Sequence, residues 1–305
     1  MAIKNIGFIG LGAMGTPMAT LLFRAGYPVK GFDIVGEQIR RLIPMGIKAA
    51  RSPGEATEGS ELILLSLPHW KAVQDAVDGK DGILKRAKEG QIIVDTTTAP
   101  PWESRAMALR LSKRKIHWMD VPVLAAPKQV MEGKAIFMVG GKKSVFHEIK
   151  PTLDKIGMKT VYVGKSGDAA MLKIAHNLIL FLNEAAAIEG FTLGLKAGLD
   201  PQVMYEVIKG GTATSDLIQR RGEDMLAGNF KVKGSLAIGV KDVGLALDSA
   251  RRLGVVLPIS GIYHQYLLNA QYRGWDKEDA TVVMRLYEEM SGLKREPEFG
   301  PSVPE

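Results

Sequence analysis

Two lysine-centred pairs in the second half of the chain could do chemistry. Lys173 and Asn177 are four residues apart in the segment Gly-Asp-Ala-Ala-Met-Leu-Lys-Ile-Ala-His-Asn, so a helix would place both on one face. A lysine buried in an apolar helix can act as an acid or base, because burial favours its neutral form. Asn177 could hold a substrate hydroxyl or carboxylate. The alternative is a lysine whose ammonium reaches water, and the residues alone leave both open.

The second pair, Lys241-Asp242, follows a glycine-containing stretch. By itself it is typical of an exposed ion pair, which contributes little to stability. We therefore expect Lys241 and Asp242 to lie at the surface.

A glycine-rich turn near the N-terminus has the spacing G-x-G-x-x-G, formed by Gly10, Leu11, Gly12, Ala13, Met14 and Gly15. It follows a strand expected at 5–9 and opens a helix that runs to about Gly26, before a second strand at 29–32. Gly10 permits the tight turn, Gly12 lets the backbone approach a pyrophosphate, and Gly15 lets helix and strand pack closely. The N-terminus of the helix offers free N–H groups to a phosphate. This context predicts a dinucleotide site.

Asp33 ends the second strand, where a carboxylate can bind the adenosine ribose hydroxyls and would repel a 2′-phosphate. No arginine follows directly, so NAD is favoured over NADP. The alternative is a solvated aspartate at a strand end. Leu67-Pro68 and Thr96-Thr97-Thr98 follow two later strands and should border the nicotinamide, because ligands bind beyond the carboxyl ends of parallel strands. The threonines could also cap the next helix.

The elements that must position these residues fall into two groups. Strands are expected at 62–65, 92–94, 116–119, 135–139 and 160–163, with helices at 70–77 and 101–112 between them. This alternation is typical of an α/β fold with a mostly parallel, doubly wound sheet. After Gly164 the pattern is helical, at 168–195, 201–209, 215–227, 236–253, 258–273 and 280–291. We predict a Rossmann domain at 1–164, an all-α domain at 165–293 entered by a long helix, and a loose tail at 294–305.

Composition narrows the function classes. The 305 residues are 46% hydrophobic and contain no cysteine, which excludes disulfides and thiolate catalysis and fits a cytoplasmic protein. The five histidines show no metal-binding spacing, so we expect no metal site. Polar residues interrupt the most apolar run, 174–195, and no membrane span is expected. The net charge of +7 could attract a nucleic acid or an acidic substrate. Because no aromatic residues are interspersed among the basic ones, we expect no nucleic-acid partner.

Ordered motifs from about residue 4 to 293 resemble the β-hydroxyacid dehydrogenase family, the group of 3-hydroxyisobutyrate dehydrogenase and tartronate semialdehyde reductase. They are GLGAMGTPMA at 10–19, Leu67-Pro68, the Asp-Thr-Thr-Thr run at 95–98, Asp120-Val121-Pro122-Val123, Gly133, the Met-Val-Gly-Gly at 138–141, Gly167, Lys173, Asn177 and Lys241-Asp242. The resemblance implies that Lys173 is the catalytic acid/base and that Asn177 orients the substrate. It also implies that Thr98 borders the nicotinamide, that Lys241 reaches over the cofactor with Asp242 supporting it, and that the chain forms a homodimer or homotetramer.

One departure from the family pattern concerns the substrate. The family's Ser-Gly-Gly after Asp-x-Pro-Val binds the substrate carboxylate, and here Val123 is followed by Leu124, Ala125 and Ala126. Losing a hydrogen bond to a charge costs about 1.5–3 kcal/mol, so an atypical acidic substrate is expected, bound near 123–126, Lys173, Asn177 and Asp242. The alternatives are a carbonyl or imine reductase without the carboxylate anchor, although imine reductases usually replace the lysine, and a non-catalytic dinucleotide-binding interaction protein.

Overall fold

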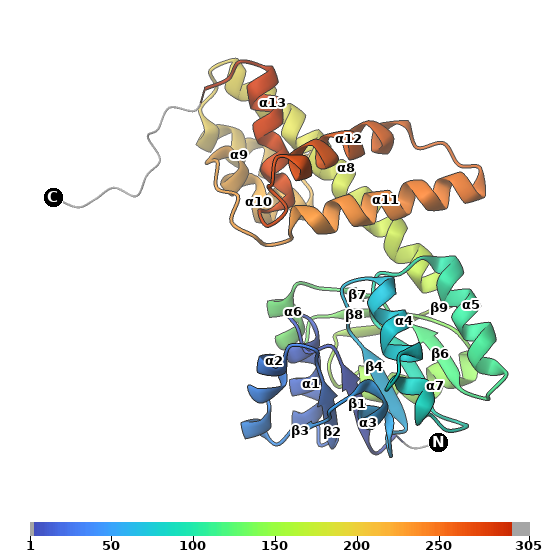
Figure 1. The fold of residues 1–305 in the computed structure, drawn as a ribbon. Helices are drawn as coiled ribbons and strands as arrows, with labels where there is room; N and C mark the ends of the chain where they lie inside the picture. Colours follow the sequence, from blue (N-terminus) through green and yellow to red (C-terminus); the bar gives the residue numbers. More distant parts are fainter. Residues whose placement is uncertain (1–2, 295–305) are drawn as a thin grey trace. The chain divides into compact units, whose positions relative to one another are not determined.

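The chain divides into two units, Met1–Lys173 and Ile174–Glu305, and the computed structural model describes residues 3–294 (Figure 1). The N-terminal unit contains every named strand of the described chain, and the C-terminal unit is helical. The division falls inside one helix, α8 (Asp168–Lys196), between Lys173 and Ile174.

The sheet of the N-terminal unit is parallel over most of its width. Its strands are β1 (Ile6–Ile9), β2 (Val29–Phe32), β3 (Lys48–Ala49), β4 (Leu62–Leu65), β5 (Ile92–Asp95), β6 (His117–Asp120), β7 (Val123–Leu124), β8 (Ile136–Gly140) and β9 (Lys159–Gly164). The order is β3-β2-β1-β4-β5-β6-β8-β7, with β9 beside β8. The pairs from β3 to β6 are parallel, as is β8 with β9, whereas β8 runs antiparallel to β6 and β7.

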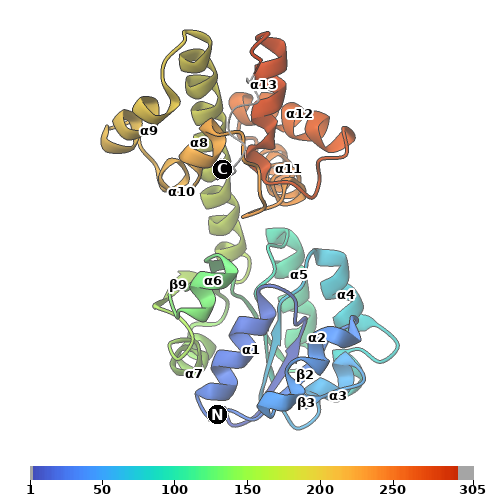
Figure 2. The ribbon, with the colours of Figure 1, turned by 90° about the vertical axis from the view of Figure 1, so that its left-hand side faces the viewer.

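Helices lie on both faces of this sheet (Figure 2), and alternating strand residues are buried against them. Phe8 and Leu64 belong to one core, with α1 (Gly15–Arg24), α6 (Pro127–Met131) and α7 (Lys143–Leu153). Ile9 and Leu65 belong to the other core, with α3 (Pro53–Thr57), α4 (Trp70–Asp78) and α5 (Pro101–Ser112). Helices on both faces explain the continuous apolar runs of the central strands.

The expected strands and longer helices of this unit are confirmed to within a few residues. Sequence patterns did not indicate the shorter elements α2 (Gly36–Arg40), α3, β3, β7, α6 and the three-residue 3₁₀ turns at Ile43–Met45 and Ile83–Lys85. They also did not indicate α7, although it buries five side chains. Most of these elements are too short to show a hydrophobic periodicity. In α7, Pro151 lies near the end of the helix, and a proline in a sequence usually argues against a helix.

The C-terminal unit contains α8, α9 (Pro201–Gly210), α10 (Asp216–Leu226), α11 (Leu236–Leu253), α12 (Pro258–Tyr272) and α13 (Met284–Met290). Pro201 and Pro258 lie in first helical turns, as expected. The segment expected as one helix at 280–291 begins as a 3₁₀ turn, Ala280–Val283. The expected tail at 294–305 lies, from residue 295 on, outside the described residues.

Helix α8 is long and apolar enough to cross a membrane by length and composition alone. Two of its buried polar side chains have partners within the helical unit, however. Asn177 binds Asp242, and Glu184 accepts a hydrogen bond from Tyr263. These contacts are those of a core helix.

Candidate active site

The glycine turn connects β1 to α1 in a conformation that requires two of its glycines. Gly10 has a φ of +89°, and a Cβ there would collide with the carbonyl oxygen of Ser66. A Cβ on Gly15 would collide with the carbonyl oxygen of Gly10. Both glycines are therefore explained by contacts within the protein.

Gly12 differs, because a Cβ on it would meet no protein atom within 4 Å. Nothing in the fold requires a glycine here, whereas a phosphate lying against the backbone would. The N-terminus of α1 also lacks a side-chain cap, because its N-cap residue Met14 forms no capping hydrogen bond, and the first turn has no acidic residue. These features fit the pyrophosphate of a dinucleotide.

Asp33 lies against the glycine turn. Its Oδ2 accepts a hydrogen bond from the Leu11 amide at 2.6 Å, and its Oδ1 accepts one from the Val35 amide at 2.8 Å. The side chain is half-buried, so the alternative of a freely solvated aspartate is wrong. The carboxylate stands beside the loop expected to bind the pyrophosphate, and its remaining lone pairs can accept from ribose hydroxyls.

The carboxyl ends of four strands form one row, because Ile9 pairs with Leu65, Leu65 with Asp95, and Asp95 with Asp120. The loops after these residues therefore lie at one edge of the sheet. This edge carries the glycine turn, Leu67-Pro68, the threonines and the segment after Asp120. It is the edge where open α/β sheets bind ligands.

The threonines shape the loop after β5. Thr96 Oγ1 donates to the carbonyl oxygen of Leu65 at 2.7 Å, and Thr97 Oγ1 accepts from the Leu67 amide at 3.3 Å. Helix α5 has Pro100 as its N-cap residue, without a side-chain cap. The alternative role of the threonines as helix caps is therefore wrong. Thr98 is half-buried in this loop.

Asp95 and Asp120 are buried carboxyls on neighbouring strand ends. Burial raises the pKa of Asp95 to about 7, against the opposing effect of its hydrogen bonds from Thr97. Burial also raises the pKa of Asp120, although Gly167 and Ala170 donate backbone hydrogen bonds to it. Neither carboxyl was assigned a role by the sequence, which shows types and spacing but not burial.

Lys173 lies in the second turn of α8, and its Nζ donates a hydrogen bond to the carbonyl oxygen of Val123 at 2.9 Å. Val123 is three residues beyond the end of β6. The ammonium is thus half-buried and held at the same edge as the glycine turn. The alternative, in which the Lys173 ammonium reaches open water, does not agree with this contact.

The segment that departs from the family pattern forms β7 and the start of α6. Leu124 and Ala125 are half-buried, and Ala126 is exposed. The Ala126 amide donates a hydrogen bond to Gln129 Oε1 at 2.8 Å, so it already has an acceptor within the protein. The sequence signal for this contact is a glutamine three residues after the N-cap residue Ala126, the position of the capping-box side chain.

Asp242 in α11 is the centre of a hydrogen-bonded group in the helical unit. Its Oδ2 accepts from Asn177 Nδ2 at 2.6 Å, and its Oδ1 accepts from Lys241 Nζ at 2.7 Å. Asn177 Oδ1 contacts His176 Nδ1 at 3.0 Å. Asp242 is only 2% exposed, so the expectation of an exposed pair is wrong. Neighbours in sequence could not reveal that Asn177, 65 residues away, would bury it.

A second buried cluster lies within the same unit and was not foreseen. Glu184 Oε1 accepts a hydrogen bond from the Tyr263 hydroxyl at 2.7 Å, and Arg221 Nη1 lies 3.9 Å from Glu184 Oε2. Arg221 also pairs with Asp279 at 2.6 Å. Burial raises the pKa of Glu184 to about 7, because Tyr263 and Arg221 only partly offset the lost hydration.

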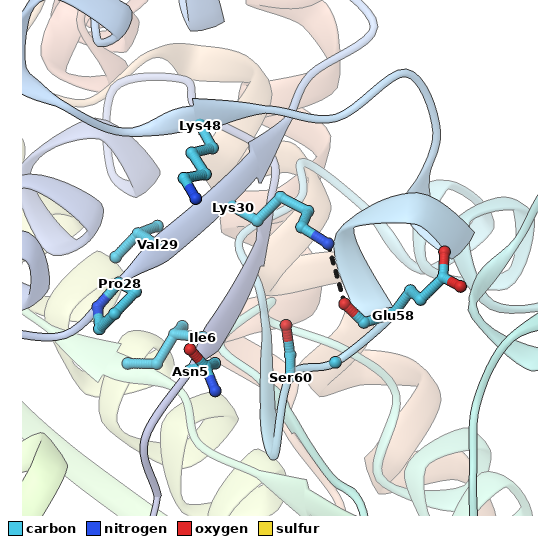
Figure 3. A pocket seen from close by; sticks show the side chains of 9 residues that line it. Asn5, Ile6, Pro28, Val29, Lys30, Lys48, Glu58 and Ser60 are labelled. Carbon is cyan, nitrogen blue, oxygen red and sulfur yellow. Dashed lines mark hydrogen bonds between the residues drawn. The ribbon is translucent and has the colours of Figure 1, made fainter.

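Two surface grooves lie at the opposite end of the strands from the glycine turn. One, of about 260 Å³, is lined by residues from the starts of β1 and β2 and by Lys48 (Figure 3). The other shares Pro28, Val29 and Lys48 with it. In Figure 3 the Lys30 ammonium bends away to the Glu58 carbonyl, at 2.9 Å. Neither groove includes a residue of the expected site. Among residues 3–294, no cluster of three or more His, Cys, Asp or Glu could hold a metal ion.

Comparisons with known proteins agree with this geometry. Residues 5–164 match the family described as the NAD binding domain of 6-phosphogluconate dehydrogenase, and residues 167–287 match the NAD-binding family of NADP-dependent 3-hydroxyisobutyrate dehydrogenase. The chain is 32% identical over 290 residues to 2-(hydroxymethyl)glutarate dehydrogenase of Eubacterium barkeri, covering 95% of this chain and 96% of that one. It is 31% identical to 2-hydroxy-3-oxopropionate reductase of Escherichia coli, over 95% and 99% of the two chains.

Among solved structures, a 3-hydroxyisobutyrate dehydrogenase from Salmonella typhimurium superposes with a TM-score of 0.84 at 26% identity, covering 93% of this chain and 99% of that one. The similarity therefore extends through both units. It includes the glycine turn, Lys173 and Asp242 within the matched ranges. The chain belongs to the β-hydroxyacid dehydrogenase family, and it is an NAD(P)-dependent dehydrogenase or reductase that acts on a CH–OH group.

Proposed function

We propose that the chain interconverts a β-hydroxy acid and its semialdehyde with NAD as the cofactor and Lys173 as the acid/base. The observation that carries this proposal is the hydrogen bond from Lys173 Nζ to the Val123 carbonyl oxygen. It holds an ammonium group at the sheet edge where the glycine turn and the β4 and β5 loops lie. A proton carrier at that edge is what oxidation of an alcohol beside a nicotinamide requires.

In this proposal, the bound nicotinamide accepts or supplies the hydride. The chain's own contribution is proton transfer: the neutral amine of Lys173 takes the proton from the alcohol oxygen on oxidation, and its ammonium form gives a proton to the carbonyl oxygen on reduction. The Val123 carbonyl oxygen accepts a hydrogen bond from this group and so fixes its position at the sheet edge. Asp242 holds the amide of Asn177 and the ammonium of Lys241, the two side chains that family resemblance assigns to substrate and cofactor.

The preference for NAD rests on Asp33. Its carboxylate is fixed by the Leu11 and Val35 amides next to the glycine turn, and Ile34 and Val35 follow it instead of an arginine. A 2′-phosphate would meet this negative charge without a cation beside it in sequence. Ribose hydroxyls would instead donate to it.

The substrate class is a small β-hydroxy acid that does not depend on a Ser-Gly-Gly anchor. Leu124 offers an apolar contact in place of a hydroxyl, and the Ala126 amide already has Gln129 as its acceptor. Part of the usual anion-binding capacity is therefore absent near 124–126. An acid with a longer or branched carbon chain would gain from contact with Leu124.

The decisive experiment is a screen of NAD reduction over 2-(hydroxymethyl)glutarate, 3-hydroxyisobutyrate, L-threonate, glycerate, and sulfonated and branched β-hydroxy acids. Lys173→Ala should lose most turnover, at least about 100-fold, because general acid–base catalysis contributes that much, while NADH binding persists. Lys165→Ala, an exposed lysine before α8, is the matched control. Unchanged turnover in Lys173→Ala would exclude the role of Lys173. If no acid is oxidised but neutral carbonyls or imines are reduced, the alternative reductase activity is correct.

We also propose that the chain forms a homodimer or homotetramer through its helical unit. Ile179 and Leu193 on α8, and Val203 and Val207 on α9, are each more than 60% exposed. Apolar side chains repeated along helices favour burial against a second copy. Light scattering coupled to size exclusion should give a mass at least twice 33.1 kDa, and a monomer would contradict the proposal.

A further inference from the structure

Helix α8 begins with an unusual anchor that comes from a distant strand. Asp120 is the last residue of β6, and its carboxylate is 3% exposed. Its Oδ1 accepts a hydrogen bond from the Gly167 amide at 2.8 Å, and its Oδ2 accepts one from the Ala170 amide at 3.0 Å. One oxygen thus binds the amide just before α8 and the other binds an amide in its first turn, and N–H groups at a helix start have no partner within the helix.

The position of these contacts relative to Lys173 is specific. Ala170 precedes Lys173 by three residues, about one helical turn. Val123, whose carbonyl binds Lys173 Nζ, follows Asp120 by three residues. The short segment from Asp120 to Val123 therefore holds α8 at two points, first at its backbone and then at the lysine ammonium.

The surroundings of Asp120 leave its carboxylate little freedom. A Cβ on Gly140, its partner on β8, would lie 2.6 Å from Asp120 Oδ2 and 2.8 Å from Oδ1. Gly167 has a φ of +86°, and a Cβ there would lie 2.6 Å from the Pro101 carbonyl oxygen. Close packing of backbone on both sides fixes the carboxylate and the amides that it binds.

We propose that Asp120 is a positioning residue for the reaction, which sets the place of Lys173 by fixing the first turn of α8. This inference rests on the proposed role of Lys173. In an Asp120→Asn variant, the side chain could accept a hydrogen bond from only one of the two amides, because its NH₂ group would face the N–H of the other. The start of α8 would then shift or fray, and the ammonium would leave its place beside Val123.

The test compares Asp120→Asn and Gly140→Ala with two matched controls. Gly140→Ala keeps the charge but displaces the carboxylate. Asp168→Asn removes a carboxylate from the same helical turn, one that binds Lys165 and Arg105 instead of β6. Gly261→Ala adds a methyl group to the helix α12, where no atom from outside the helix lies within 4 Å. The readouts are kcat and KM for the best β-hydroxy acid, the dissociation constant of NADH, and hydrogen exchange of amides 167–173.

Both test variants should lower kcat by about 10- to 100-fold, the cost of a misplacement near 1 Å, with NADH affinity within about twofold. Exchange at 167–173 should accelerate. Both controls should remain within about twofold of the unsubstituted enzyme in kcat, because neither touches the anchor. If Asp120→Asn or Gly140→Ala folds and keeps kcat and exchange unchanged, the proposal fails.

Two outcomes separate this inference from the proposed function. If Lys173→Ala keeps its turnover while Asp120→Asn accelerates exchange in α8, the anchor is real and the role of Lys173 is wrong. If Lys173→Ala is inactive and Asp120→Asn is not impaired, the positioning role is wrong. A measurement without variants also decides: rapid exchange of the Gly167 and Ala170 amides in the unsubstituted protein would overturn the anchor itself.

Discussion

Replacing Glu184 with glutamine should remove a large part of the pH dependence of the helical unit's stability. Glu184 is 1% exposed, and burial raises the pKa of its carboxyl from the ordinary 4.5 to about 7. The folded state therefore favours the protonated form more strongly than the unfolded state does. The stability from this group is complete below about pH 4.5 and is lost as the pH rises through about 7.

The magnitude follows from the two pKa values. A rise from 4.5 to about 7 corresponds to about 3 kcal/mol of unfolding free energy, at about 1.4 kcal/mol per pKa unit. Glutamine imitates the protonated form and still accepts from the Tyr263 hydroxyl. Its NH₂ group would replace Oε2, which has no hydrogen-bond partner and lies 3.9 Å from the Arg221 cation. That loss of attraction reduces the expected gain at pH 8.5 to about 1–3 kcal/mol.

Urea unfolding at pH 5.5, 7.0 and 8.5 measures this effect, followed by fluorescence and by hydrogen exchange of peptides from α8 and α12. The glutamine variant should match the unsubstituted protein at pH 5.5 and exceed it at pH 8.5. Asp95 also has a pKa near 7, but its contribution cancels in the difference between the two proteins. Glu206→Gln, at an exposed site on α9, is the control and should show no such divergence. Parallel stability curves for Glu184→Gln and the unsubstituted protein would refute the reasoning.

Three further predictions concern the two units separately. The Gly12→Ala variant should fold normally and bind NADH at least about tenfold more weakly. The Gly10→Ala variant should have a lower melting temperature, because Gly10 has a positive φ and a Cβ there would collide with Ser66. If both variants melted at the same temperature and bound NADH equally well, the phosphate role of Gly12 would be contradicted. Asp33→Ala should weaken NAD binding and narrow the preference over NADP in paired kcat/KM measurements; an unsubstituted enzyme that uses NADP better would reverse the cofactor assignment. Asp242→Ala should cost about 2–4 kcal/mol in chemical unfolding, because Asn177 and Lys241 both lose a buried charged partner, and a loss below 1 kcal/mol would show that water replaces it.

The turn and the strand end that we expect to bind the cofactor could be located from the sequence, because both are local features. The six residues from Gly10 to Gly15 and the strand that ends at Asp33 lie within about thirty residues, and each residue type has a backbone reason that spacing reveals. Asp33 was expected near the turn, and the structure adds that the Leu11 amide holds it there. The parallel sheet followed similarly from alternating apolar runs.

What could not be predicted depends on contacts between distant segments. The sequence suggested that Asp242 forms an exposed ion pair with Lys241, whereas in the structure Asn177 of α8 binds it. Asp120 lies 47 residues from Gly167, and no periodicity connects them. Glu184 interrupts an apolar run in sequence, yet it is buried with Tyr263, 79 residues away. Burial and long-range pairing give these carboxyls their roles, and residue type and spacing report neither.

In the proposed function, the segment from β7 to α6 would allow a change of substrate without a change of reaction. Val123 contributes its backbone carbonyl to Lys173, so the side chains that follow can vary without moving the ammonium. Leu124 removes a hydroxyl, and Gln129 takes the Ala126 amide that an anion would use. A competing carboxylate would have to displace that carboxamide, at a cost of about 0.5–1.5 kcal/mol for one hydrogen bond. If the proposed function is correct, the place of the Lys173 ammonium depends on the backbone carbonyl of Val123, whereas substrate choice depends on the side chains of Leu124 and Gln129, so the two can be altered separately.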